Sequence, residues 1–119
     1  MSKLLLVFAG GGLGAVCRFL LTTALSGKLG NFPLGTFAAN VLGSLLMGLV
    51  VGILAGRHES IRLFVAVGFL GGFTTFSSFS AETLTLIHGG QFFSVAVNIV
   101  GSVATGLLAC AVGLKLGGI

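Results

Sequence analysis

Hydroxyl and aromatic side chains are concentrated in one short stretch of an otherwise apolar chain. Between residues 68 and 83 the sequence reads GFLGGFTTFSSFSAET. An aromatic ring has a positive edge and a hydroxyl group can donate a hydrogen bond, so interleaving the two can solvate a small anion without a fixed positive charge. Phe76 and Phe79 are three residues apart, which predicts that their rings stack along one helix face. The competing interpretation is ordinary core packing.

The same stretch predicts a break in the helix that contains it. Gly71 and Gly72 are followed, after one residue, by Thr74 and Thr75, and glycine and β-branched residues are poor helix formers. A break inside a membrane frees backbone carbonyl and amide groups, which is tolerated only where protein or a cavity covers them. Freed carbonyl oxygens at such breaks face cations, so an ion site is expected here.

Two further sets of polar residues lie within apolar stretches. Their members recur at spacings of three or four residues, which places each set on one helix face. The sets are Thr36, Asn40 and Ser44, and Asn98, Ser102 and Thr105. Such faces either make hydrogen bonds between helices or line a path for ions. The asparagine in each face favours the path.

Two charged side chains lie inside the predicted helices. Glu82 is the one acid within an apolar stretch, because Glu59 falls in a connection. Glu82 is either a helix-end residue near the membrane surface, close to His88, or a functional group. Arg18 lies roughly 22 Å beyond Lys3 along a helix. Its side chain either extends to the nearer membrane surface or makes the mouth of a pathway positive.

Composition requires these helices to span a membrane. Of 119 residues, 55% are hydrophobic and 7% are charged, whereas a soluble domain carries about 25% charged residues. This excludes a soluble enzyme, and the scattered basic residues exclude a nucleic-acid-binding patch. The predicted fold is an all-α membrane protein, one domain over residues 1–119. Its four transmembrane helices, each long enough to cross a bilayer, are expected at residues 4–25, 33–55, 61–87 and 92–116.

Enzymatic activity is not expected of such a bundle. One intramembrane glutamate and two histidines in connections supply neither an acid–base pair nor an activated nucleophile. Any function must therefore be carried by the packed helices and the polar groups between them.

Small residues and charge distribution predict how the helices associate. Glycines four residues apart allow the backbones of neighbouring helices to approach closely. They are Gly10 and Gly14, Gly48, Gly52 and Gly56, and Gly68 and Gly72. Four short helices enclose little space, so a homo-oligomer is expected. The basic residues divide four to two between the two ends of the bundle, a shallow bias that lets a chain insert in either direction.

The segment GGFTTFSSFS at residues 71–80 resembles the signature of the Fluc (CrcB) family of bacterial fluoride channels. The resemblance extends along the whole chain and includes the glycine-rich first helix with Arg18 and the helix that carries Asn40. Two departures are visible, because Phe73 stands where leucine is common in the family and Ser78 where threonine is common.

The resemblance implies a dual-topology homodimer of antiparallel subunits with two pores in the bacterial inner membrane. It implies passive export of cytoplasmic fluoride, which reduces fluoride toxicity. The backbone carbonyls of Gly71 and Thr74 are expected to hold a sodium ion at the dimer centre, with Arg18 in the vestibule. Residues expected along the fluoride path are Asn40, Phe76, Ser77, Phe79, Ser80, Glu82, Asn98 and Ser102.

Two other functions have weaker support. A small multidrug exporter also has four helices and dual topology, but it needs a carboxylate deep in its first helix. Residues 4–25 contain no acid, and the chain has no Trp or Tyr to contact an organic cation. A membrane assembly subunit without transport activity would need the polar faces only for contacts, and would leave the break in the third helix without a purpose.

Overall fold

The computed structural model describes residues 2–119, a region whose regular secondary structure is entirely helical. The elements are α1 (Ser2–Leu25), α2 (Leu34–Ile53), α3 (Glu59–Arg62), η1 (Leu63–Leu70), α4 (Gly71–Phe73), α5 (Phe76–His88) and α6 (Phe92–Leu116). They make four spans that are long and apolar enough to cross a membrane, because α3, η1, α4 and α5 together form one span. The prediction of a multi-pass membrane protein with four spanning helices is therefore confirmed.

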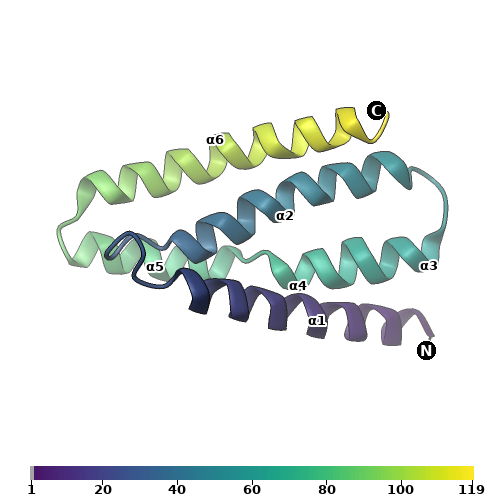
Figure 1. The fold of residues 1–119 in the computed structure, drawn as a ribbon, viewed down its shortest axis with the longest axis horizontal. Helices are drawn as coiled ribbons and strands as arrows, with labels where there is room; N and C mark the ends of the chain where they lie inside the picture. The colour runs from purple at the N-terminus through teal and green to yellow at the C-terminus, as the bar shows by residue number, and fades with distance from the viewer. Residues whose placement is uncertain (1) are drawn as a thin grey trace.

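The four spans form an elongated bundle that measures 47 × 29 × 20 Å. Figure 1 shows α6 beside α2, and the third span between α2 and α1. Both termini and the connection from α2 to α3 lie at one end of the bundle, whereas the connections from α1 to α2 and from α5 to α6 lie at the other. Lys3 and Glu59 form an exposed ion pair at 3.0 Å, which links the start of α1 to α3 at the end that holds the termini.

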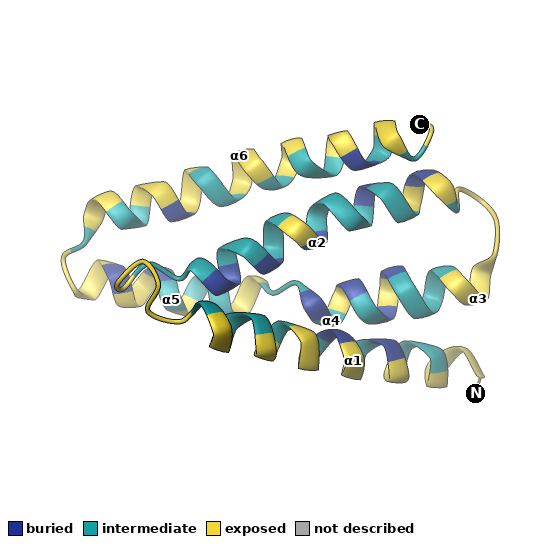
Figure 2. Ribbon diagram, viewed as in Figure 1, coloured by how far each residue is buried: buried dark blue, intermediate teal, exposed yellow. Residues whose placement is uncertain are grey.

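Glycines create the two tightest helix contacts, as their spacing predicts. In α2, a Cβ on Gly48 would overlap the backbone of Cys110, and on α6 a Cβ on Gly113 would overlap the backbone of α2. On α1, a Cβ on Gly10 or on Gly14 would likewise overlap the backbone of η1, at Phe69 among other residues. Each of these glycines is buried, and Figure 2 shows the exposed residues on the outer sides of α1 and α6. Missing side chains thus let neighbouring backbones touch.

After α3, the third span continues as a π-helix, which the sequence did not indicate. The π-helical segment covers Leu63–Leu70, and the amide of Gly71 donates to the carbonyl oxygen of Ala66, five residues earlier. π-Helices are rare and occur frequently at functional sites. In this chain the π-helical segment leads directly into the break.

The predicted break is present, but it lies at the threonines and not at the glycines. Gly71 and Gly72 remain helical, and Gly72 packs against the backbone of Gly11. Thr74 and Thr75 are extended, with φ/ψ of −89°/156° and −152°/124°. The glycines therefore provide the close approach to α1, and the two β-branched residues provide the interruption.

We predict that Gly14→Ala destabilises the bundle, because the added Cβ must displace the backbone around Phe69. Overpacking of this kind costs about 1–3 kcal/mol, so the midpoint of thermal unfolding in detergent is expected to fall. Gly12→Ala is the matched control, since a Cβ there meets no atom within 4 Å. Equal midpoints for the two variants would contradict the packing argument.

Candidate functional site

The break in the third span exposes two helix ends halfway along the bundle. α4 ends at Phe73 and α5 begins at Phe76, with two extended residues between them. The hydroxyl of Thr75 accepts a hydrogen bond from the amide of Ser78 at 3.2 Å. This is a helix N-cap. Its signal in the sequence is a threonine three residues before a polar residue at a helix start, and the sequence-based prediction missed it.

Asn40 on α2 satisfies the backbone of the break from one side. Its side-chain amide nitrogen donates to the carbonyl oxygen of Thr75 at 2.9 Å, and its side-chain oxygen accepts from the amide of Thr75 at 2.8 Å. Both polar backbone groups of one extended residue are thereby paired. An unpaired backbone group inside a membrane costs several kcal/mol, so this two-point contact stabilises the break.

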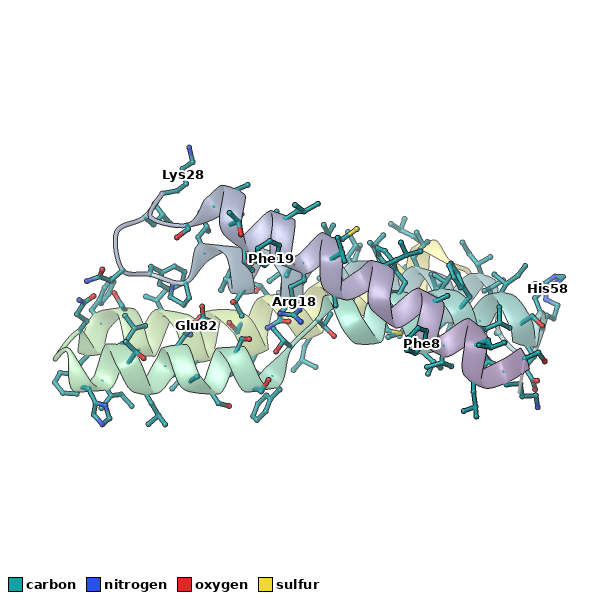
Figure 3. The ribbon with its side chains drawn as sticks, turned by 90° about the horizontal axis from the view of Figure 1, so that it is seen from below. Phe8, Arg18, Phe19, Lys28, His58 and Glu82 are labelled. Atoms are coloured by element: carbon teal, nitrogen blue, oxygen red, sulfur yellow. The ribbon has the colours of Figure 1, made fainter. Side chains whose placement is uncertain are left out.

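Arg18 on α1 supplies a hydrogen-bond donor to the backbone just before the break. Its Nε atom donates to the carbonyl oxygen of Gly72 at 3.1 Å. Figure 3 shows Arg18 midway along the bundle, between Lys28 at one end and His58 at the other. This hydrogen bond directs the Arg18 side chain toward the break in the third span. A charged donor also makes a stronger hydrogen bond than a neutral one.

The carbonyl oxygens of Gly71 and Thr74 differ from those of Leu70, Gly72 and Thr75, which have hydrogen-bond donors. Within residues 2–119, neither accepts a hydrogen bond, whereas the carbonyl of Leu70 accepts from both the amide and the hydroxyl of Thr74 at 3.0 Å. Three carbonyl oxygens of the break, those of Gly71, Phe73 and Thr74, therefore have no partner from a loop or a side chain within residues 2–119. They are the hard, neutral donors that suit a small monovalent cation.

An open cavity of about 310 Å³ lies beside the break. Its lining includes Asn40, Ser44, Thr74, Thr75 and Phe76. It therefore brings Asn40 and Ser44 of the polar face of α2 to the extended threonines, whereas Thr36 lines a different cavity.

The two phenylalanines after the break are neighbours on α5. Their ring centroids are 5.7 Å apart and the ring planes are tilted by 37° to each other, so the two rings are neighbours along the helix, in line with their three-residue spacing. Phe76 is 79% exposed in the single chain, and Phe79 is half-buried. Ring edges are the electropositive part of a phenylalanine, so the exposed ring of Phe76 can offer one to an anion.

Two serine hydroxyl groups near the start of α5 have different partners. Ser80 donates to the carbonyl oxygen of Phe76 at 3.0 Å, and the hydroxyl of Ser77 lies 3.3 Å from that of Thr75. Both residues are near the break, but each keeps acceptor capacity and Ser77 is exposed. Ser77 and Ser80 therefore lie on α5 beside the two phenylalanines, and their place along a fluoride path stays a prediction.

Glu82 lies farther along α5 and faces a second cavity. This cavity, of about 450 Å³, is formed by the end of α1, the following connection, the start of α2 and α5. Its polar lining includes Thr22, Thr36 and Thr85. The Oε1 atom of Glu82 is buried and has no hydrogen-bond partner within residues 2–119. Figure 3 shows Glu82 between Arg18 and the end of the bundle near Lys28.

Asn98 and Ser102 on α6 are not part of the break. Asn98 is 1% exposed and donates to the hydroxyl of Thr83 on α5 at 3.0 Å, and Ser102 lies 3.4 Å from the side-chain oxygen of Asn98. Thr83 was not singled out in the sequence, because one threonine in a polar helix carries no distinctive signal. Neither cavity described above is lined by Asn98.

Comparison with known proteins identifies the family. The family model described as "CrcB-like protein, Camphor Resistance (CrcB)" matches residues 5–114. A protein of Novosphingobium aromaticivorans named "Fluoride-specific ion channel FluC" is 49% identical, with 98% of this chain and 96% of that protein covered. Proteins with the same name are 44% identical in Phocaeicola vulgatus, with 96% of this chain and 97% of that protein covered, and 45% identical in Thermus thermophilus, with 99% and 97% covered. These matches include the break and the helices that pack against it. They show that the chain belongs to the CrcB family.

Proposed function

We propose that this protein is a fluoride channel that exports cytoplasmic fluoride passively. The observation that carries the proposal is the broken third span, where phenylalanine and hydroxyl side chains follow two extended threonines. Relatives that match over nearly their whole length bear the name of fluoride-specific channels. The site offers uncharged donors and ring edges, which are a channel's means of passing an anion and not an enzyme's means of transforming a substrate.

The driving force for export is electrical. Hydrogen fluoride is a weak acid that crosses a membrane in its neutral form and releases fluoride inside the cell. A negative interior potential favours outward movement of an anion by about 2.3 kcal/mol per charge per 100 mV. An open, selective pore in the bacterial inner membrane therefore removes fluoride without an energy-coupling site.

The proposed fluoride path follows α5 from the break toward the second cavity. Phe76 and Phe79 present ring edges, Ser77 and Ser80 present hydroxyl groups, and Glu82 lies at the end of the path. Arg18 makes the vestibule positive while its Nε holds Gly72. Fluoride is the smallest and strongest-accepting halide, so close hydroxyl donors and ring edges favour it over chloride.

The functional unit is proposed to be an antiparallel homodimer with dual topology. Two features of the single chain support this: Phe76 is 79% exposed beside an open cavity, and three carbonyl oxygens at the break lack partners within residues 2–119. A second copy in the opposite orientation would cover both. The four-to-two division of basic residues between the ends fits a chain that inserts either way.

A sodium ion is proposed at the dimer centre, held by the backbone carbonyls of Gly71 and Thr74. The donor set fits sodium, because it consists of uncharged oxygens, and residues 2–119 contain no group of three or more His, Cys, Asp or Glu side chains for another metal. The ion would supply positive charge at mid-depth and compensate the exposed carbonyl dipoles. Arg18 and Asn40 keep the neighbouring backbone groups paired and hold the two free oxygens in place.

Fluoride efflux from liposomes that contain the purified protein tests the function. We predict fast release of fluoride, read with a fluoride-selective electrode, and little release of chloride under the same potassium gradient and ionophore. Protein-free liposomes give the leak. Absence of fluoride release from a well-folded protein would contradict the proposal and leave the fold unaffected.

Phe76→Ile is predicted to reduce fluoride efflux strongly, because isoleucine fills a similar volume without an electropositive ring edge. The size-exclusion profile in detergent is expected to be unchanged. Phe93→Ile is the matched control, since Phe93 is also exposed, at 84%, but lies at the start of α6 away from the break. Wild-type efflux from Phe76→Ile would remove Phe76 from the mechanism.

Removal of sodium tests the proposed cation site. When sodium is replaced by N-methylglucamine on both sides and during purification, fluoride efflux is predicted to fall, and sodium is predicted to restore it. The organic cation is too large to enter a site between backbone carbonyls. Full activity after exhaustive dialysis, with sodium absent by elemental analysis, would contradict the site while leaving the channel function intact.

A further inference from the structure

The half of the third span after the break has few neighbours within the chain. α5 contacts α6 and, more sparsely, α2, whereas α2 and α6 pack against each other closely through their glycines. Figure 1 shows α5 at the end of the bundle away from the termini, beside α6. The position of α5 therefore depends on a small number of specific contacts.

One of these contacts is a chain of hydrogen bonds that starts on α6 and ends on α5. Ser102 lies 3.4 Å from the side-chain oxygen of Asn98, the side-chain amide of Asn98 donates to the hydroxyl of Thr83 at 3.0 Å, and the hydroxyl of Thr83 donates to the carbonyl oxygen of Phe79 at 2.7 Å. Asn98 is 1% exposed, and Thr83 is also buried. The chain thus links α6 to a residue of the proposed fluoride path.

The order of donors and acceptors in this chain is fixed. The carbonyl of Phe79 can only accept, so the proton of the Thr83 hydroxyl points toward it and a lone pair of that hydroxyl faces Asn98. Asn98 must therefore present its amide nitrogen, which leaves its oxygen toward Ser102. Such a chain has one favourable arrangement, and a buried network that is fully paired holds its members in a unique position.

We propose that Asn98 is a positioning residue for fluoride passage: through Thr83 it sets the position of α5 against α6 and therefore the placement of the Phe79 ring. This assigns Asn98 a role behind the path instead of along it, in agreement with its burial and its absence from both cavities. The proposal rests on the proposed channel function for its flux readout, and on the geometry alone for a second readout.

Three variants separate positioning from stability. Thr83→Val keeps the shape of the side chain but leaves the amide of Asn98 buried without its acceptor. Asn98→Leu removes the donor and keeps a similar volume. The double variant leaves neither partner unpaired, and replacing both partners by apolar groups of the same shape is nearly neutral for stability.

Thr105→Val is the matched control. Thr105 is exposed on α6, and its hydroxyl donates to the carbonyl of Gly101 within the same helix. Like Thr83→Val, this substitution removes a threonine hydroxyl group, but it leaves the contact between α5 and α6 in place.

Fluoride efflux relative to chloride is expected to fall about tenfold in Thr83→Val and Asn98→Leu, the change in a rate that corresponds to the loss of one buried hydrogen bond. The double variant is expected to recover the thermal stability of the wild type but not its ratio of fluoride to chloride efflux. Thr105→Val is expected to behave as the wild type in both measurements.

The second readout does not depend on transport. With 4-fluorophenylalanine at position 79, the ¹⁹F resonance is expected to shift or broaden in Thr83→Val and in the double variant, and to stay in place in Thr105→Val. Recovery of both selectivity and the ¹⁹F resonance in the double variant would overturn the proposal, because the chain would then contribute only stability. If the wild type passes no fluoride, the channel function fails, and the ¹⁹F comparison still decides whether Asn98 positions Phe79.

Discussion

The pairing of Asn40 with Thr75 is the interaction on which the rest of the structure depends. An interrupted helix inside a membrane exposes peptide groups to a medium that offers them no partner. The side-chain carboxamide of Asn40 pairs with both the carbonyl and the amide of Thr75, through hydrogen bonds of 2.9 and 2.8 Å. A leucine at position 40 would leave the amide and the carbonyl of Thr75 without these partners, at a cost of several kcal/mol for each unpaired group inside a membrane.

Close packing of α1 and α2 against the third span makes this pairing possible. Gly14 brings α1 against the backbone that precedes the break, which places Arg18, one turn later, within reach of the Gly72 carbonyl. Gly43 on α2 lies against the side chain of Thr74, one turn after Asn40. In each helix a glycine and the polar residue nearby therefore act together, because the missing side chain sets the distance that the hydrogen bond spans.

The parts that could be predicted from the sequence are those with a local cause. Long apolar runs predict the four spans, and glycines four residues apart predict the packed faces, because both depend on helix geometry alone. The weak helix formers around Thr74 predict a break, although its place depends on the cap made by Thr75. The partners of the break could not be predicted: Arg18 and Gly72 are 54 residues apart, and Asn40 and Thr75 are 35 apart. Pairs so distant along the chain are decided by how the helices are oriented around their axes, which composition does not report.

The π-helical segment Leu63–Leu70 affects how the residues after it are oriented around the helix axis. Its hydrogen bonds reach back five residues instead of four, so each residue turns the chain through a smaller angle than in an α-helix. The segment consequently sets the angular phase with which Gly72 meets α1 and Thr75 meets α2. The same eight residues wound as an α-helix would carry the same side chains in the same order and yet aim them at the wrong neighbours. The winding of the residues before the break therefore aims Gly72 and Thr75, in addition to the close packing that Gly68 and Gly72 allow.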